Sequence, residues 1–160
     1  MAELTKWKSI KVQQEHEISC IAAGYEWLLK YLGIENIDYS TFQTEFNLQG
    51  RGIADNNFET IANAIENKYP NISFNFRDFT HGNDKIIFIE SLISMDDPCL
   101  ISIANSPDGG WHIMPVVYID TNIIVCFDYG LQQINRYTIN EIIYRHENWK
   151  GGKNIAWIMN

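Results

Sequence analysis

The spacing of apolar residues changes about halfway along the chain. In the first half, apolar side chains recur every three or four residues, which is the period of an amphipathic helix. This pattern predicts one helix that begins near Cys20 and stops at Gly33, a second that starts after Asp38, and a third that runs to about Tyr69. Pro70 ends the third helix, because proline lacks an N–H group and clashes with the preceding turn.

In the second half, apolar and polar residues alternate in short runs, which is typical of half-buried strands. Phe74 and Phe76, for example, fall on one face of a strand at 73–79. Further strands are predicted at 99–104, 112–119, 122–127, 132–137 and 154–159, and helices at 84–95 and after Thr138. We expect Pro115 at an edge or a bulge, because it cannot donate to a neighbouring strand.

Helices followed by an antiparallel sheet predict an α+β fold, in which an N-terminal helical half packs on a C-terminal sheet. Capping residues indicate where the helices begin. The predicted caps are Ser19 for the helix at Cys20, the capping-box pairs Ser40 with Gln43 and Thr138 with Glu141, and Asn57 after a loop at 50–57.

Length and composition favour a single globular domain over residues 1–160. Of the 160 residues, 46% are hydrophobic and 13% aromatic, which excludes a disordered chain. No apolar run approaches the roughly 18 residues of a membrane span. The N-terminus lacks the apolar stretch of a secretory signal, so we expect a cytoplasmic protein.

The charge of the chain limits its partners. A net charge of −8 and a pI of about 4.9 argue against nucleic acid and favour a basic peptide or protein substrate. The three cysteines, Cys20, Cys99 and Cys126, are odd in number and far apart, which suits reduced thiols. Neither the cysteines nor the histidines have metal-ligand spacing, and we expect neither a metal nor another cofactor.

Cys20 is the first candidate for catalysis. It is expected in the first turn of its helix, where unpaired N–H groups and the positive end of the helix dipole favour a thiolate over a thiol. A nucleophilic cysteine also needs a base. Without one, Cys20 is a small buried hydrophobe, as cysteines outside disulfides commonly are.

His112 is the best candidate for that base, because it opens a strand after a glycine turn. If the next turn has three residues, Asp120 to Asn122, His112 lies opposite Gly130, and Asp128 is its diagonal neighbour on the same face. Asp128 could then orient the imidazole. Alternatively, an aspartate at this position is ordinary turn chemistry.

The other histidines are weaker candidates. The sequence places His16 in an acidic loop, His81 in a polar turn, and His146 near a helix end, where a cation would meet the helix dipole favourably.

The ordered residues resemble the papain-like cysteine peptidases, and more closely the bacteriocin-processing branch that cleaves after double-glycine leaders. The similar segments are Gln14-x5-Cys20, the helix end at 29–33, Pro98 to Ile103, Gly109-Gly-Trp-His112, Phe127-Asp128-Tyr-Gly130 and Trp149-Lys-Gly151. Three positions depart from the family pattern: Ser19 and Ile21 flank the cysteine, where an acidic residue and a glycine are usual, and Tyr129 follows the aspartate, where a proline is common.

The resemblance implies a role for each matched residue. Cys20 would be the nucleophile, His112 the base, Asp128 the orienting group and Gln14 the side-chain donor of the oxyanion hole. Gly109 and Gly110 would let a substrate backbone approach closely. Trp111 would wall the cleft or fill the core.

We therefore expect a thiol hydrolase that cleaves a peptide or amide bond through an acyl-enzyme. Two alternatives remain open at this point. The same triad could serve an acyltransferase, a transglutaminase or a deamidase, or the chain could be a catalytically inactive binding module on a papain-like scaffold.

Overall fold

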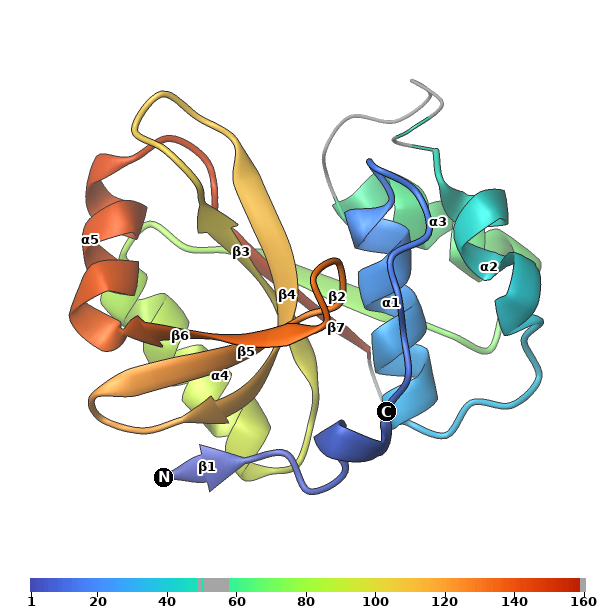
Figure 1. Ribbon diagram of the computed structural model, residues 1–160, viewed down its shortest axis with the longest axis horizontal. Coiled ribbons are helices and arrows are strands. Elements are labelled where there is room, and N and C mark those ends of the chain that lie inside the picture. Colours follow the sequence, from blue (N-terminus) through green and yellow to red (C-terminus); the bar gives the residue numbers. More distant parts are fainter. Residues whose placement is uncertain (49, 51–57, 159–160) are drawn as a thin grey trace.

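Two groups of helices lie at the two sides of one antiparallel sheet (Figure 1). This computed structural model describes residues 1–48, 50 and 58–158. Within them the chain forms five α-helices and seven strands, an α+β arrangement. The helices are α1 (Cys20–Tyr31), α2 (Tyr39–Phe46), α3 (Phe58–Lys68), α4 (Gly82–Ser94) and α5 (Ile139–Asn148), and a short 3-10 turn covers Trp7–Ser9. None of the described helices is long and apolar enough to cross a membrane.

The sheet joins strands that are distant in sequence. Its order is β2-β7-β3-β4-β5-β6, and β1 pairs with β4 outside this path. The strands are β1 (Ala2–Glu3), β2 (Phe74–Asp78), β3 (Cys99–Ala104), β4 (Trp111–Ile119), β5 (Ile123–Asp128), β6 (Gln133–Thr138) and β7 (Asn154–Ile158). Every pairing is antiparallel, as the alternating pattern predicted.

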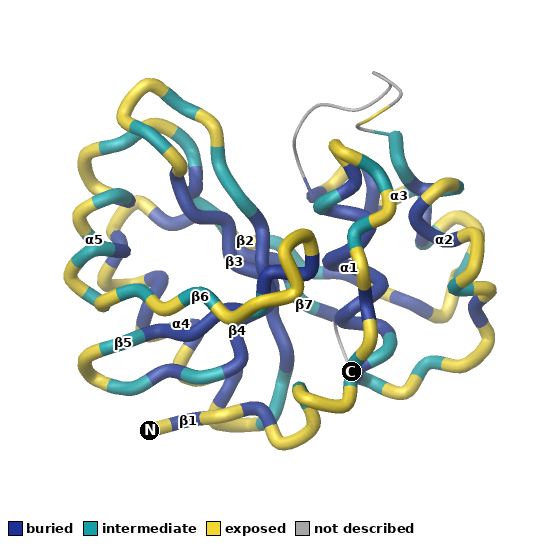
Figure 2. Tube along the Cα trace, viewed as in Figure 1, coloured by how far each residue is buried: buried dark blue, intermediate teal, exposed yellow. Residues whose placement is uncertain are grey.

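Helix α1 is the most deeply buried helix, and it packs against the sheet (Figure 2). All of its residues are buried except Cys20 and Lys30. Gly24 allows the close approach, because a Cβ atom there would lie 2.8 Å from Cδ1 of Leu100 and 3.1 Å from the hydroxyl of Tyr129. The predicted stop is confirmed: Gly33 has a φ of +74°, and it ends the helix in a Schellman motif.

Two of the predicted caps are wrong. Asp38, not Ser40, caps α2, because its carboxylate accepts from the Ser40 N–H group. Ser19 lies at the N-cap position of α1, but its hydroxyl makes no capping bond. Thr138 does cap α5, through the N–H of Glu141. Asn57 and nearly all of the predicted 50–57 loop lie outside the described residues.

Pro115 does not lie at an edge. It sits in the central strand β4 opposite Leu100 of β3, and the neighbouring β4–β5 pairing contains a bulge between Val116 and Tyr118. The predicted bulge therefore occurs, close to Pro115 in sequence. The predicted edge position is wrong.

Lys85 of α4 is an unusual core residue, because a lysine is rarely buried without an acidic partner. Its side chain is 1% exposed, and its Nζ donates to the carbonyls of Ser102 at 2.6 Å and Gly152 at 2.8 Å. Burial lowers the pKa of Lys85 to about 7, and the nearby charge of Lys153 acts in the same direction. The amine ties α4 to strand β3 and to the turn before β7.

We expect the stability of the protein to rise with pH just above neutrality. Between pH 7 and 10.5 the unfolded chain holds a proton on Lys85 that the folded chain releases, so the free energy of unfolding increases with pH. From pH 7 to 8.5 the increase from this residue is about 1–2 kcal/mol. Chemical denaturation at several pH values measures it. Lys85→Met should remove this increase of the free energy of unfolding with pH, and Lys150→Met, an exposed control, should keep it. An equal pH dependence in the wild type and both variants would contradict the assignment to Lys85.

Candidate active site

Cys20 is the one cysteine of the three, all of them described, that is partly exposed. It is the first residue of α1, as predicted. Cys99 and Cys126 are buried in the core, and burial raises the pKa of both thiols, that of Cys126 to about 12. At neutral pH those two remain unreactive thiols, so thiol chemistry falls to Cys20.

The loop before α1 is held by Gln43, a buried residue of α2 that the sequence offered only as a capping partner. Its side-chain oxygen accepts from the Glu15 N–H at 2.9 Å and from the Ser19 hydroxyl at 3.2 Å. Its amide nitrogen donates to the carbonyl of Gln13 at 2.8 Å and to Glu26 at 3.1 Å. The buried amide therefore fixes the chain that leads into Cys20, and this explains why Ser19 does not cap the helix.

A bulge in β4 brings His112 and Asp128 to the same face of the sheet. The decisive pairs are Ile119 with Ile124 at the hairpin end and Val116 with Cys126 nearer the site. The strands are joined by three residues, 120–122, as predicted, but the first pair lies one residue away from the predicted register, which pairs Ile119 with Ile123. The bulge between these two pairs compensates for the shift, so the predicted register returns at Val116 and Cys126 and continues toward His112 and Asp128.

The side chains of His112 and Asp128 meet, with Nε2 of the imidazole 3.4 Å from Oδ2 of the carboxylate. Oδ1 of Asp128 accepts from the N–H groups of Gly130 at 2.9 Å and Leu131 at 3.1 Å. Asn135 of β6 donates to Oδ2 at 3.3 Å. Sequence reasoning missed Asn135, because its role depends on the pairing of β5 with β6. The buried carboxylate is thus held at both oxygens, which fixes the face it presents to His112.

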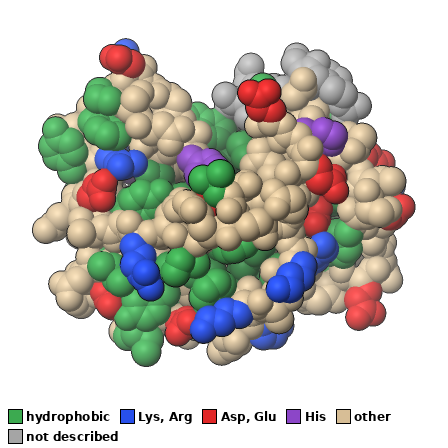
Figure 3. Space-filling model, in the orientation of Figure 1, with side chains coloured by type: hydrophobic (Ala, Val, Ile, Leu, Met, Phe, Trp, Pro, Cys, Tyr) green, Lys and Arg blue, Asp and Glu red, His purple; other side chains and the backbone are tan. Residues whose placement is uncertain are grey.

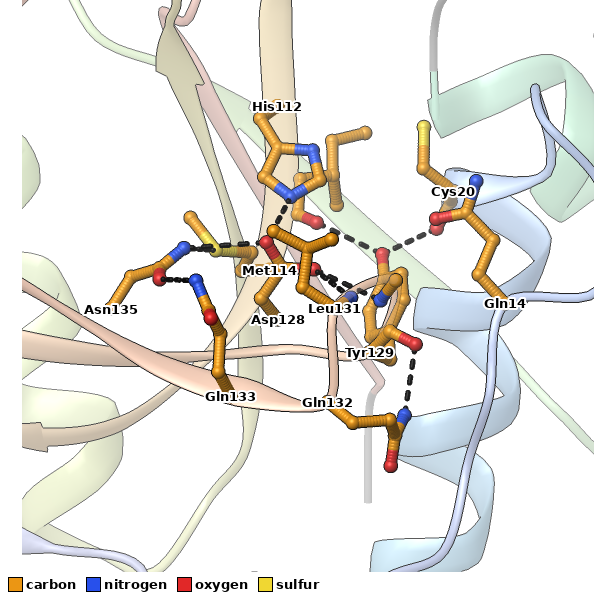
Figure 4. A network of polar contacts seen from close by, with 12 residues as sticks. Gln14, Cys20, His112, Met114, Asp128, Tyr129, Leu131, Gln132, Gln133 and Asn135 are labelled. Atoms are coloured by element: carbon orange, nitrogen blue, oxygen red, sulfur yellow. Dashed lines mark hydrogen bonds and ion pairs between the residues drawn. The ribbon is translucent and has the colours of Figure 1, made fainter.

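Because Nε2 of His112 contacts Asp128, the other ring nitrogen, Nδ1, is the one that can interact with a nucleophile. Figure 4 shows Nδ1 of His112 turned toward the side of the site where Cys20 lies, across the space between β4 and α1. Tyr129, directly after Asp128, donates its hydroxyl to the carbonyls of Cys20 and of Ile113, the latter at 3.0 Å. The backbones beside the thiol and the imidazole are therefore both within reach of one hydroxyl.

Gln14 lies beside this group, but its amide is already engaged. Its Nε2 donates to the carbonyls of His16 at 2.8 Å and Glu17 at 3.1 Å. Its backbone N–H donates to the carbonyl of Tyr129 at 3.1 Å. The residue is in place near Cys20, and an oxyanion role requires it to exchange one loop carbonyl for the substrate oxygen.

A depression of about 450 Å³ opens beside His112 and Asp128. Its lining residues are Gln14, Glu15, His16, Glu17, His112, Asp128, Gly130 and Leu131. The space-filling view shows the surface hollowed between the helical side and the sheet side (Figure 3). The depression is thus built from the loop before α1 and from the ends of β4 and β5.

Gly109, Gly110 and Trp111 do not line this depression. Successive residues of a strand point to opposite faces, so Trp111 is directed away from the side of His112. A Cβ at Gly151 would lie 3.0 Å from the Trp111 ring, which places the indole over the turn before β7. Gly109 and Gly110, with φ of +129° and +81°, form the turn before β4. Of the two roles open to Trp111, packing fits the structure.

The remaining histidines lie elsewhere. His16 contacts the hydroxyl of Thr44 at 2.9 Å, and His81 is exposed at the start of α4. His146 is buried, its Nε2 is 2.9 Å from the carbonyl of Phe79, and burial lowers its pKa. The interpretation of His146 as a cation at a helix end is therefore wrong, because its surroundings favour the neutral ring.

The imidazole and carboxylate of the sheet thus face the cysteine at the start of α1 across the space between β4 and α1. Among the described residues, no three or more His, Cys, Asp or Glu side chains are grouped so as to hold a metal ion. The chain matches no protein-family model and no curated protein sequence.

Asp128 should contribute to stability as well as to the site. Asp128→Ala leaves two N–H groups without an acceptor and should lower the free energy of unfolding by about 2–3 kcal/mol. Asp128→Asn keeps an acceptor for both, so its cost should be about 1 kcal/mol. Urea denaturation measures both variants. Equal losses would show that the turn bonds at Oδ1 contribute little.

Proposed function

We propose that this chain is a papain-like cysteine hydrolase that cleaves a peptide or amide bond through an acyl-enzyme on Cys20. The observation that carries the proposal is the contact between His112 Nε2 and Asp128 Oδ2. This contact leaves Nδ1 of His112 facing the N-terminal end of α1, where the partly exposed thiol of Cys20 lies. A nucleophile, a base and a group that orients the base are the parts that covalent catalysis requires.

In the first half of the reaction, His112 Nδ1 accepts the proton of the Cys20 thiol, and the sulfur attacks the substrate carbonyl carbon. The carbonyl oxygen becomes an oxyanion. The N–H of Cys20 and the amide of Gln14, released from a loop carbonyl, would donate to it, and each such donor is typically worth about 3–4 kcal/mol. The C–N bond then breaks, and the leaving amine takes the proton from His112.

In the second half, water replaces the amine. His112 takes a proton from the water as its oxygen attacks the thioester carbon. The C–S bond breaks, the carboxylic acid leaves, and the proton returns to the sulfur. Asp128 keeps Nε2 protonated and the ring oriented throughout, because its carboxylate accepts from that nitrogen.

The order of the parts supports the papain-like assignment. The thiol comes from the first residue of a central helix in the N-terminal half, and the imidazole and carboxylate come from adjacent strands in the C-terminal half. Within that family we infer a relation to the bacteriocin-processing branch from the ordered motifs. Tyr129 stands where proline is common in that branch, so the proposal does not extend to double-glycine specificity.

The depression supports a basic substrate. Glu15 and Glu17 line it, and no lysine or arginine is among the described residues that do so. Leu131, 69% exposed, adds an apolar surface at the rim. A peptide with a cationic residue beside an apolar one fits these groups, because the carboxylates would favour its positive charge. The net charge of −8 acts in the same direction.

The first test is the reactivity of Cys20. In the native protein, iodoacetamide should label Cys20 at pH 5.5 at least tenfold faster than a simple thiol such as glutathione, because His112 stabilises the thiolate. Cys99 and Cys126 should stay unlabelled, and peptide mapping by mass spectrometry resolves the three sites. His112→Ala should remove the acid-side reactivity.

The reaction itself is tested with a library of short peptides analysed by mass spectrometry. Hydrolysis predicts new peptide termini with the native protein and none with Cys20→Ala. A one-dalton gain on glutamine would indicate deamidation, and an added amine would indicate acyl transfer. Absence of all three products, together with ordinary reactivity of Cys20, would leave a binding module.

The charge preference is tested on peptides that the protein cleaves. Replacing Glu15 and Glu17 together by glutamine should lower kcat/KM about three- to tenfold for a peptide with lysine near the cleaved bond. High salt should shrink the difference, because it screens exposed charges. Glu35→Gln, an exposed acid distant in sequence from the depression, is the control. An unchanged ratio between lysine and glutamate peptides would rule out recognition by these carboxylates.

A further inference from the structure

Tyr129 contacts Gln14 and Cys20 and the residue next to His112. It follows Asp128 in the chain, and its backbone carbonyl accepts from the Gln14 N–H at 3.1 Å. Its hydroxyl donates to the carbonyls of Cys20 and Ile113, and Ile113 adjoins His112. Figure 4 shows the tyrosine between the N-terminal end of α1 and the strands.

We propose that Tyr129 is a positioning residue whose hydroxyl sets the spacing between Cys20 and His112. This inference rests on the proposed hydrolase function and adds to it a part that the resemblance does not supply. The hydroxyl does not touch the reacting atoms. It acts through the two backbone segments that carry them.

The physical reason for this role is that two hydrogen-bond acceptors, the carbonyls of Cys20 and Ile113, lie close to the same hydroxyl. Carbonyl oxygens repel one another, and a hydroxyl between them supplies the hydrogen that lets both approach. Tyr129 is fully buried, so no water competes for the position. Burial also raises its pKa well above the usual value, which keeps the hydroxyl protonated and able to donate. Without the hydroxyl, the start of α1 and the strand β4 lose their shared donor.

The backbone of Tyr129 is held by several hydrogen bonds, and its hydroxyl packs against α1. Its backbone carbonyl accepts two further bonds, from the side-chain amides of Gln13 at 3.1 Å and Gln132 at 2.9 Å. Gly24 of α1 lies against the hydroxyl, since a Cβ there would be 3.1 Å from it. Replacement by phenylalanine keeps the ring and removes only the donor.

Helix α1 offers a matched control in Tyr25. It too is fully buried, and its hydroxyl donates to a backbone carbonyl, that of Phe58, at 2.9 Å. Tyr25→Phe therefore removes the same kind of bond from the same helix, but toward α3 instead of toward β4. A merely structural role would make the two variants behave alike.

The experiment measures the pH dependence of iodoacetamide labelling of Cys20, and kcat and KM on a cleaved peptide, in both variants. Denaturation midpoints should fall by similar amounts. Tyr129→Phe should slow labelling at pH 5.5 at least tenfold and lower kcat at least tenfold, with KM within twofold. Tyr25→Phe should match the wild type within twofold in all three.

The outcomes separate the two proposals. If the wild type shows no acid-side labelling and no cleavage, the hydrolase function fails, and the positioning role falls with it. If the wild type is active and Tyr129→Phe matches it or matches Tyr25→Phe, the positioning role alone is wrong. Should Tyr129→Phe not fold, Gly24→Ala, which keeps the hydroxyl and crowds it, must slow labelling at pH 5.5; an unchanged rate would overturn the role.

Discussion

The close packing of α1 against the sheet is the constraint on which the rest of the structure depends. The helix is buried along nearly its whole length, and Gly24 allows it to approach Leu100 and Tyr129. Because interiors are packed as densely as organic crystals, the position of such a helix is set by the residues it touches. Its first residue, Cys20, is therefore placed relative to the strands by the packing of residues further along the helix.

Buried polar groups complete that placement at three points. Gln43 holds the loop before α1, Asp128 holds the turn after β5, and the Tyr129 hydroxyl lies between the two backbones. Each is satisfied by several partners, so burial costs little and the geometry is specific. Lys85 does the same for α4 at the other side of the sheet. The candidate site thus lies where several buried networks meet.

The periodicity of the sequence predicted most of the elements, because side-chain spacing of two or near four residues reports directly on burial. Local chemistry was less reliable. Ser19 and Gln43 have the right residue types for caps, yet they bind each other across two helices. His146 has the position of a helix-end cation, yet it is buried and its pKa is lowered. Polar side chains form hydrogen bonds with the groups that tertiary packing places beside them. The spacing of residues in the sequence does not identify those groups.

The sequence by itself determined the α+β class, the start of α1 at Cys20 and its end at Gly33, because these follow from local spacing and backbone preference. Only the tertiary structure decided that His112 meets Asp128, since the pairing at the hairpin end is shifted by one residue from the predicted register and a bulge compensates for the shift. It also decided the roles of Asn135, Gln43 and Tyr129. Those roles arise from contacts between segments far apart in the chain. Such contacts depend on register and packing, which the local spacing of residues does not determine.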